Sequence, residues 1–300
     1  MSRKTKKKNN DKDFLTINPF KTSKDKVKTT DMMEKGVIPR HPFRCLISGA
    51  SGSGKSNLLL DLLCCSKKYK NYFDYIFVMS PTAGSLDDSF KALKKSCKKS
   101  KLFIINDLNP DQIKKIMDTQ EEIIKEKGLK KTPRVLLIYD DIISNVKFMN
   151  SDAFKKSFIA SRHYNMSVFV LSQRYHSIPR ICRLQANNIL YFLGSASENA
   201  RLVDEFTPPR YSKKEFDEMV TFATREPYSF LYVNMTQPFK TRYRKCLHSI
   251  MTLDRFEENE KEEKKDCDES DSNSDDEGDE ENDEGDDKED EKNEDKKYIK

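Results

Sequence analysis

The chain of 300 residues lacks the patterns that mark membrane-spanning, secreted and zinc-binding proteins. It has no apolar run near the ~18 residues that a transmembrane helix needs, and its N-terminus has no signal-peptide pattern. Its seven cysteines include no C-x-x-C pair and no cluster with histidine, which indicates reduced thiols and no zinc site. We therefore expect an intracellular protein without a membrane span.

The net charge of +5 conceals two regions of opposite sign. Residues 254–300 hold 25 acidic and 9 basic residues, a net charge of −16, whereas the rest of the chain carries +21. So acidic a segment cannot bury enough apolar surface to fold, and we expect it to be disordered. It could be a solvating appendage, a mimic of nucleic acid that competes for the basic body, or a docking segment for a basic partner. We likewise expect residues 1–36 to be a basic, disordered N-terminus, which leaves one domain at residues 37–253.

The stretch GASGSGKS matches the phosphate-binding pattern G-x-x-x-x-G-K-[ST]. Its glycines allow positive φ angles and expose successive backbone N–H groups to a polyphosphate. Lys55 can reach the β and γ phosphates of ATP, and the hydroxyl of Ser56 can be a ligand of Mg²⁺. We assign the nucleotide-binding residues as Gly49, Ala50, Ser51, Gly52, Ser53, Gly54, Lys55 and Ser56.

The residues on either side of this stretch support a nucleotide site. Cys45–Ile47 form an apolar run that indicates a buried strand, and leucines follow at helical spacing, at Leu58, Leu59, Leu62 and Leu63. A flexible loop rich in glycine and serine is the alternative, but it does not require a strand before it and a helix after it.

Apolar runs and capping signals predict the remaining elements. Strands are expected at residues 75–79, 102–105, 135–139, 168–171, 189–192, 228–233 and 241–246. One helix should begin with Asn109 as N-cap, Pro110 in the first position and Gln112 in the capping-box position. Another helix is expected near 152–161, and two shorter helices are expected beyond the strand at 189–192, the second of which begins at Ser212. The alternation of helices with continuously apolar strands predicts an α/β fold, with a mostly parallel sheet flanked by helices on both faces.

Two carboxylates follow the apolar strand of VLLIYDD. Ligands of open α/β sheets bind at the carboxyl ends of the strands, so Asp140 can hold Mg²⁺ through its water shell. Asp141 can orient or deprotonate the attacking water, as in P-loop enzymes that hydrolyse their nucleotide. Two aspartates after a strand can also simply cap a turn. Their combination with the loop at Gly49–Ser56 favours the catalytic interpretation.

Polar residues around the next strand are candidates for sensing and stabilising hydrolysis. Gln173 follows that strand, where its amide can contact both the γ phosphate and the water, although it could be an ordinary turn residue. Arg162 precedes the strand and could be an arginine finger for the site of a neighbouring subunit, or a helix C-terminal residue that interacts with the helix dipole. Three further arginines could contact a DNA backbone, form an exposed basic face or contact other subunits, namely Arg174, Arg180 and Arg183.

Three segments together carry a resemblance to a known family: HPFRCLISGASGSGKS, VLLIYDD and SRHYNMSVFVLSQRYHSIPR. The chain resembles the poxvirus-type genome-packaging ATPases of large DNA viruses and virophages, which belong to the FtsK/HerA superfamily of DNA motors. The similarity spans roughly residues 37–250 and excludes both charged ends. The third segment is the most specific of the three, because phosphate-binding loops occur in many families.

The resemblance implies a RecA-like sheet in which the strand before Gln173 lies between the loop strand and the strand of Asp140. By the motif match, Lys55 and Ser56 would bind ATP and Mg²⁺, Asp140 would bind the metal, Asp141 would activate water and Gln173 would act as a sensor. Many superfamily members have glutamate at the second acidic position, so Asp141 is one methylene shorter than their residue.

The resemblance also implies three partners: further copies of this chain in a ring-shaped homo-oligomer, double-stranded DNA, and a capsid or portal-vertex protein. It implies that this protein is found in the host cytoplasm or viral factory, or associated with the virion. Three other functions are alternatives to a motor that packages DNA. A helicase-like motor of the same superfamily would separate the strands of the duplex instead of translocating it. A P-loop kinase would need no pair such as Asp141 and Gln173, and no arginine-rich lid is recognisable. A nucleotide-gated structural protein of the virion would rarely turn over.

Overall fold

The computed structural model describes residues 29–252, with gaps at 83–87 and 97–99. The chain divides into two units, Met1–Phe256 and Glu257–Lys300, and the second lies outside the described residues. The disorder that we expect for residues 254–300 therefore falls outside the described part, as does that of residues 1–28. Residues 31–34 form a short helix whose Met33 is buried, so the packed region begins before residue 37.

A nine-stranded sheet forms the centre of the first unit, in the order β3-β2-β4-β5-β1-β6-β7-β8-β9. The strands are β1 Arg44–Ser48, β2 Tyr75–Met79, β3 Lys101–Ile105, β4 Val135–Asp140, β5 Met166–Ser172, β6 Asn188–Phe192, β7 Phe230–Asn234, β8 Tyr243–Lys245 and β9 Ser249–Met251. The strands from β3 to β6 in this order are parallel, and the pairs from β6 to β9 are antiparallel. The expected α/β class with a mostly parallel sheet is confirmed.

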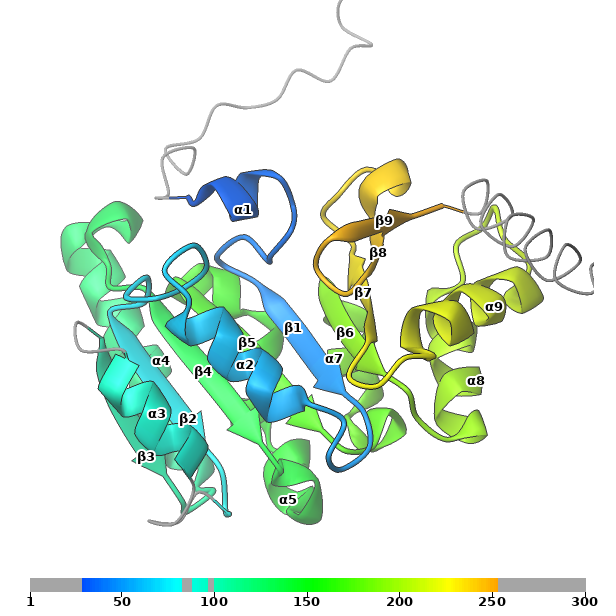
Figure 1. The fold of residues 1–300 in the computed structure, drawn as a ribbon. Helices are drawn as coiled ribbons and strands as arrows, with labels where there is room; N and C mark the ends of the chain where they lie inside the picture. The colour runs from blue at the N-terminus through cyan, green and yellow to red at the C-terminus, as the bar shows by residue number, and fades with distance from the viewer. Residues whose placement is uncertain (1–28, 83–87, 97–99, 253–300) are drawn as a thin grey trace, which may run out of the picture. The chain divides into compact units, whose positions relative to one another are not determined.

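Helices cover both faces of the sheet (Figure 1). They are α1 Asp31–Glu34, α2 Lys55–Cys64, α3 Asp88–Ser96, α4 Pro110–Lys127, α5 Val146–Asn150, α6 Asp152–Ile159, α7 Arg180–Gln185, α8 Ala196–Phe206 and α9 Lys213–Thr224. Helices α1, α2 and α3 pack on one face, and α4 to α9 supply the core of the other. Figure 1 views the sheet from the side of α2 and α3.

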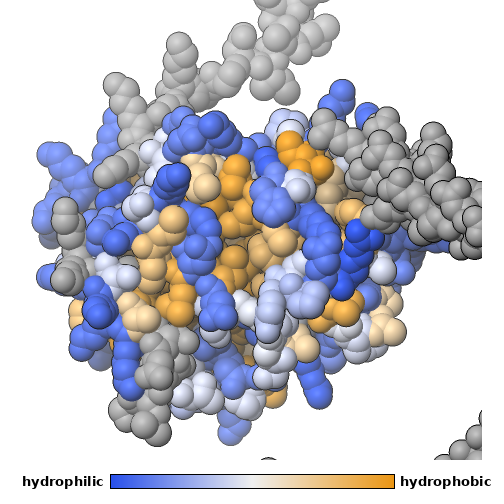
Figure 2. Space-filling view, in the orientation of Figure 1, coloured by the Kyte–Doolittle hydropathy of each residue, from blue (hydrophilic) through white to orange (hydrophobic). Residues whose placement is uncertain are grey.

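Successive strand residues point to opposite faces, so each parallel strand feeds two cores. In β1, Cys45 and Ile47 pack under α2, whereas Leu46 joins the core beneath α4 to α9. This is why β4, β5 and β6 are apolar almost throughout, as expected for strands buried on both faces. On the outer side of α2 and α3, hydrophilic side chains surround smaller areas of hydrophobic ones (Figure 2).

Several sequence expectations need correction in detail. Asn109 does cap α4, but its side chain accepts a hydrogen bond from the N–H of Asp111, and Oε1 of Gln112 is buried without a partner among the described residues, so no capping box forms there. The capping box that begins α9 at Ser212 is present. Helices α1, α3, α5 and α7 and strand β9 were not predicted; all of them except α3 have six residues or fewer. No helix of the described residues combines the length and apolar character needed to cross a bilayer.

Candidate functional site

The strand order brings the predicted polar residues to one edge of the sheet. Asp140 is the last residue of β4, Gln173 follows β5, and Gly49 follows β1. Strand β5 pairs with β4 on one side and with β1 on the other, which confirms the arrangement implied by the resemblance. Because the three strands are parallel, their carboxyl ends, and the residues that follow them, lie side by side.

A hollow of about 350 Å³ lies at this edge. It is lined by Ser51, Gly52, Gly54, Lys55, Ser56, Asn57, Thr82, Asp140, Asp141, Leu171, Ser172 and Gln173. Five of the eight loop residues assigned from the sequence are therefore on its wall. The other three, Gly49, Ala50 and Ser53, are not: the hydroxyl of Ser53 is buried within the loop, and the carbonyls of Gly49 and Ala50 accept hydrogen bonds from Lys55.

Two features of the loop require glycine. A Cβ atom at Gly49 would lie 2.5 Å from Cβ of Phe192, so the loop leaves β1 in contact with the neighbouring strand β6. Gly54 has a φ of 101° and is the N-cap of α2, a backbone conformation that side chains disfavour. The loop thus turns sharply into α2, whose first-turn N–H groups have no intrahelical acceptor and face the hollow with the positive end of the helix dipole.

Lys55 extends over the loop at the floor of the hollow. Its Nζ donates to the carbonyl oxygens of Gly49 and Ala50, each at 2.7 Å. Partial burial lowers the pKa of Lys55, and the carboxylates of Asp140 and Asp141 oppose this shift. The ammonium group therefore lies within electrostatic reach of both aspartates, in a position where an anion can bind between the lysine and the loop amides.

The two aspartates occupy different backbone environments. Asp140 ends β4 in ordinary extended conformation, whereas Asp141 has a φ of 52° and ψ of 34° and precedes a 3₁₀ turn at Ile142–Ser144. The left-handed region is uncommon for residues other than glycine, although aspartate and asparagine tolerate it. The change of direction places both carboxylates on the wall of the same hollow.

A hydrogen-bonded turn presents Gln173. Ser172 is buried at the end of β5; its hydroxyl donates to the carbonyl of Arg174 at 2.7 Å and accepts from the Arg174 N–H at 3.1 Å. The carbonyl of Ser172 also accepts from the N–H of Gly49 at 3.2 Å. The exposed Gln173 is therefore held directly beside the phosphate-binding loop.

Sequence reasoning missed four residues of the wall: Asn57, Thr82, Leu171 and Ser172. Thr82 comes from the turn after β2, and its hydroxyl is 3.1 Å from that of the buried Ser80. The signal that could have found it is its position just after an apolar strand, in the same way as Asp140. No rule of sequence alone states that β2 is the neighbour of β4.

Arg162 lies at the other edge of the sheet. It belongs to a 3₁₀ turn at Ser161–Tyr164 just before β5, whereas Gln173 follows the same strand, so about 20 Å of extended chain separates them. Arg162 is exposed. The partial burial of Arg44, at the start of β1, lowers the pKa of Arg44, and the positive charge of Arg162 lowers it further. The residue cannot act on the site of its own chain.

Arg183 is not an exposed cation, which corrects the idea that all three arginines of this segment form a basic face. Its guanidinium donates to both carboxylate oxygens of Glu205, at 2.6 and 2.9 Å, and both side chains are less than 10% exposed. It also donates to the carbonyls of His176 and Ile178. Arg183 thus stabilises the turn after Gln173 and does not face solvent, whereas Arg174 and Arg180 are exposed.

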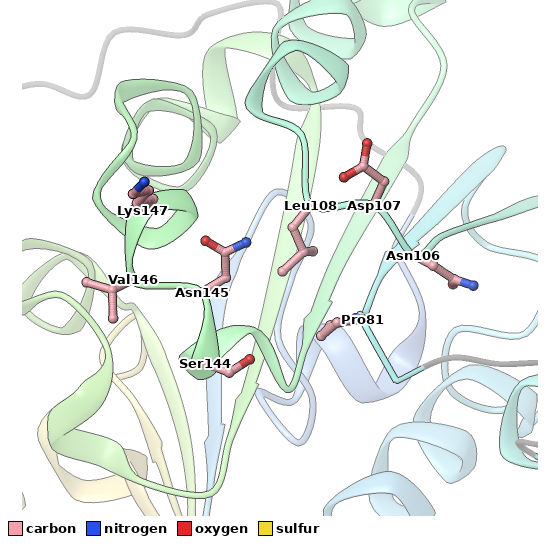
Figure 3. Close-up of a pocket in the computed structure, with 8 residues that line it drawn as sticks. All are labelled: Pro81, Asn106, Asp107, Leu108, Ser144, Asn145, Val146 and Lys147. Carbon is pink, nitrogen blue, oxygen red and sulfur yellow. The ribbon is translucent and has the colours of Figure 1, made fainter.

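A second, larger hollow of about 570 Å³ lies beside the first. The turns after β2, β3 and β4 line it, with Asp107 and Leu108 on one side and the segment 144–147 on the other (Figure 3). Pro81 lines the larger hollow and the next residue, Thr82, lines the smaller one, so the turn after β2 contributes to both. Among the described residues that line the larger hollow there is one lysine and no glycine-rich loop, so these residues do not offer the donors that a polyphosphate needs.

The residues of the smaller hollow fit a nucleotide with a divalent cation. The loop amides and Lys55 offer donors to phosphate oxygens, and Ser56 and Asp140 offer the oxygen ligands that Mg²⁺ prefers. Fold and site together define the class: an α/β protein of the P-loop type, with an additional strand between the loop strand and the acidic strand.

Residues 32–226 match the family described as Poxvirus A32 protein, and the chain belongs to that family. It is 27% identical over 184 residues to the DNA packaging protein OPG160 of Variola virus and to that of Vaccinia virus, which covers 60% of this chain. The chain spans about 63% of the length of these relatives. It also resembles the DNA-packaging ATPase B204 of Sulfolobus turreted icosahedral virus, with 17% identity and a TM-score of 0.49, over 71% of this chain and 100% of that one.

Proposed function

We propose that the protein is a Mg²⁺-dependent ATPase that moves double-stranded DNA into a viral capsid. The observation that carries the proposal is the meeting of Lys55, Ser56, Asp140, Asp141 and Gln173 around one hollow at the sheet edge. A binding protein needs only the loop, whereas hydrolysis needs groups that position water against the γ phosphate. The relatives named DNA packaging proteins support the use to which the hydrolysis is put.

The loop and Lys55 bind the triphosphate in this proposal. The amides at the start of α2 donate to the β and γ phosphate oxygens, and Lys55 exchanges the carbonyls of Gly49 and Ala50 for phosphate oxygens. Ser56 and Asp140 would hold Mg²⁺, which neutralises charge on the phosphates when bound. The partial burial of Lys55 strengthens its interaction with an anion, because less water competes for the ammonium group.

Asp141 and Gln173 act on the water. Asp141 accepts a proton or a hydrogen bond from the attacking water, and its left-handed backbone turns the shorter aspartate side chain toward the hollow. The amide of Gln173 contacts both the water and the γ phosphate, so its hydrogen bonds change when the bond to the γ phosphate is broken. The turn held by Ser172 passes that change to Arg174.

A ring of subunits completes the site. Arg162 lies at the edge of the sheet opposite its own loop, and it is exposed, so it can approach the hollow of a neighbouring copy. There its guanidinium stabilises the charge that develops during phosphoryl transfer. Activity should therefore depend on protein concentration, since a monomer lacks one of the groups.

The DNA would be held through its phosphates. Arg174 and Arg180 are exposed cations in the segment that follows Gln173, and contacts of this kind read no sequence. A capsid or portal-vertex protein would be the second partner, in the cytoplasm or viral factory of an infected cell. Binding to DNA should weaken steeply with salt, because each phosphate contact releases a counterion.

ATP hydrolysis with and without duplex DNA tests the proposal. We expect DNA to stimulate hydrolysis, Lys55→Ala to abolish it, and Lys67→Ala, which removes the same charge from an exposed position beyond the other end of α2, to leave it unchanged. Hydrolysis that DNA does not change would contradict the motor. Separation of duplex strands would assign the chain to the helicase-like motors instead.

A further inference from the structure

An exposed tyrosine occupies a turn at the edge of the candidate site. Glu226 to Ser229 form a four-residue turn that is closed by a hydrogen bond from the N–H of Ser229 to the carbonyl of Glu226, at 3.1 Å. Pro227 is the second residue of this turn, and Tyr228 is the third, with a φ of 64°. The hydroxyl of Ser229 also donates to the carbonyl of Glu226, at 2.7 Å, which fixes the turn a second time.

Tyrosine is an unusual residue for this position. A turn with proline second and a positive φ at the third residue favours glycine or asparagine there, because a larger side chain crowds the backbone. Tyr228 is 70% exposed, so burial does not compensate for the strained backbone. Strained backbone at an exposed aromatic residue is a feature of binding sites, where the strain positions a side chain for a ligand.

The turn lies against the phosphate-binding loop. Strand β7 runs antiparallel to β6, with Phe230 opposite Phe192, so the segment before β7 lies at the edge where β1 and β6 end. A Cβ atom at Gly54 would be 3.3 Å from Cδ1 of Tyr228. The tyrosine ring therefore stands directly beside the last glycine of the loop.

The ring is on the side of the loop opposite to the hydrolytic residues. The strand order β4-β5-β1-β6-β7 puts Asp140 and Gln173 on one side of the loop strand, and Tyr228 on the other. A triphosphate with its γ phosphate beside Asp140 and Gln173 must extend its α phosphate, ribose and base away from them. This direction leads along the loop toward β6 and β7.

We propose that Tyr228 stacks on the base of the bound nucleotide. The inference rests on the proposed function, because it takes the γ phosphate to lie at Asp140 and Gln173. Stacking needs only the flat surface of a base, so the ring should accept purines without selecting adenine by hydrogen bonds. The strained turn keeps the ring at the loop before the nucleotide arrives.

Two variants separate the ring from the turn. Tyr228→Asn removes the ring but keeps a residue that tolerates a positive φ, and Tyr228→Phe keeps the ring and removes only the hydroxyl. Calorimetric titration of the full chain with ATP, ADP and inorganic tripolyphosphate, which has no base, compares them. Phe103→Ala, which removes an exposed ring from β3 at the far side of the sheet, is the control.

We expect Tyr228→Asn to weaken the affinity for ATP and ADP by roughly tenfold, from the usual contribution of base stacking, and to leave the affinity for tripolyphosphate unchanged. Its melting temperature should not fall, because asparagine relieves the strain at this position. Tyr228→Phe and Phe103→Ala should bind all three ligands as the wild type does.

Other outcomes overturn the proposal in distinguishable ways. An equal loss of affinity for tripolyphosphate would mean that the ring supports the loop and does not contact the base. Unchanged affinity for ATP in Tyr228→Asn would mean that the base lies elsewhere. A wild-type chain that binds neither ATP nor tripolyphosphate would refute the nucleotide site itself, whatever the variants do.

Discussion

The buried ion pair of Arg183 and Glu205 should stabilise the fold, because it connects the turn after Gln173 to α8. The carboxylate of Glu205 accepts from Arg183 at 2.6 and 2.9 Å and from the hydroxyl of Tyr175 at 2.8 Å. Burial alone would raise the pKa of Glu205, but the hydrogen bonds from Arg183 and Tyr175 outweigh it and lower that pKa. The pair is thus charged and fully satisfied in the folded protein.

Glu205→Gln removes the negative charge and leaves the buried guanidinium of Arg183 without its counterion. Breaking a buried pair in this way costs about 3–5 kcal/mol, and we expect the lower end, because glutamine keeps one acceptor for Arg183. For a domain of this size, a loss of about 3 kcal/mol lowers the melting temperature by roughly 6–12 °C. Equilibrium unfolding in urea and a thermal scan measure the two quantities.

Helix α8 supplies a matched control one residue away. Asp204 pairs with Lys213 at 2.6 Å, but the two side chains are 51% and 70% exposed. Exposed pairs contribute about 0–1 kcal/mol, so Asp204→Asn should change stability little. If Glu205→Gln is no less stable than Asp204→Asn, the buried pair does not stabilise the fold and the reasoning from burial is wrong.

Three further predictions concern the loop, the pH dependence of stability and the ring. Gly49→Ala should lower the free energy of unfolding in urea by about 1–3 kcal/mol, because its Cβ would collide with Phe192. Gly52→Ala should lower it by about 1 kcal/mol, because the φ of 76° is unfavourable for alanine although the space around it is open. Burial lowers the pKa of His41 from 6.5 to about 4, so the folded protein binds this proton less readily than the unfolded chain does. The free energy of unfolding should therefore be highest above pH 6.5 and fall by about 3 kcal/mol as the pH decreases to 4. His41→Asn should make the free energy of unfolding less dependent on pH in this range. Mixing Arg162→Ala with wild-type subunits should lower the specific ATPase activity by more than the fraction of variant subunits. Activity that falls only in proportion to that fraction would exclude Arg162 as an arginine finger in a neighbouring site.

Local patterns were enough to predict much of this protein. The loop at Gly49–Ser56 is recognisable because a continuous stretch of chain contains the glycines, the lysine and the hydroxyl that a phosphate needs. The parallel strands are recognisable because burial on both faces requires continuous apolar runs. Asp140 and Gln173 are recognisable for a related reason, since polar residues that follow such strands lie at the edge where ligands bind.

The partners of buried charges could not be read from the sequence. Arg183 lies in a basic segment, which is typical of an exposed surface, but α8 brings Glu205 to it across the packed interior. Periodicity states which face of a helix is apolar, and it does not state which charged residue of another helix will be opposite. The short helices α5 and α7 also could not be predicted from local patterns, because tertiary packing and not local propensity stabilises them.

The sequence by itself determined the strand-loop-helix unit and predicted the candidate hydrolytic residues, because each depends on neighbours in the chain. Only the tertiary structure decided what surrounds them. Thr82 reaches the hollow because β2 pairs with β4, and Tyr228 stands beside Gly54 because β7 returns antiparallel to β6. Strand pairing is set by packing between distant segments, so no local pattern around Tyr228 could have connected it with the loop.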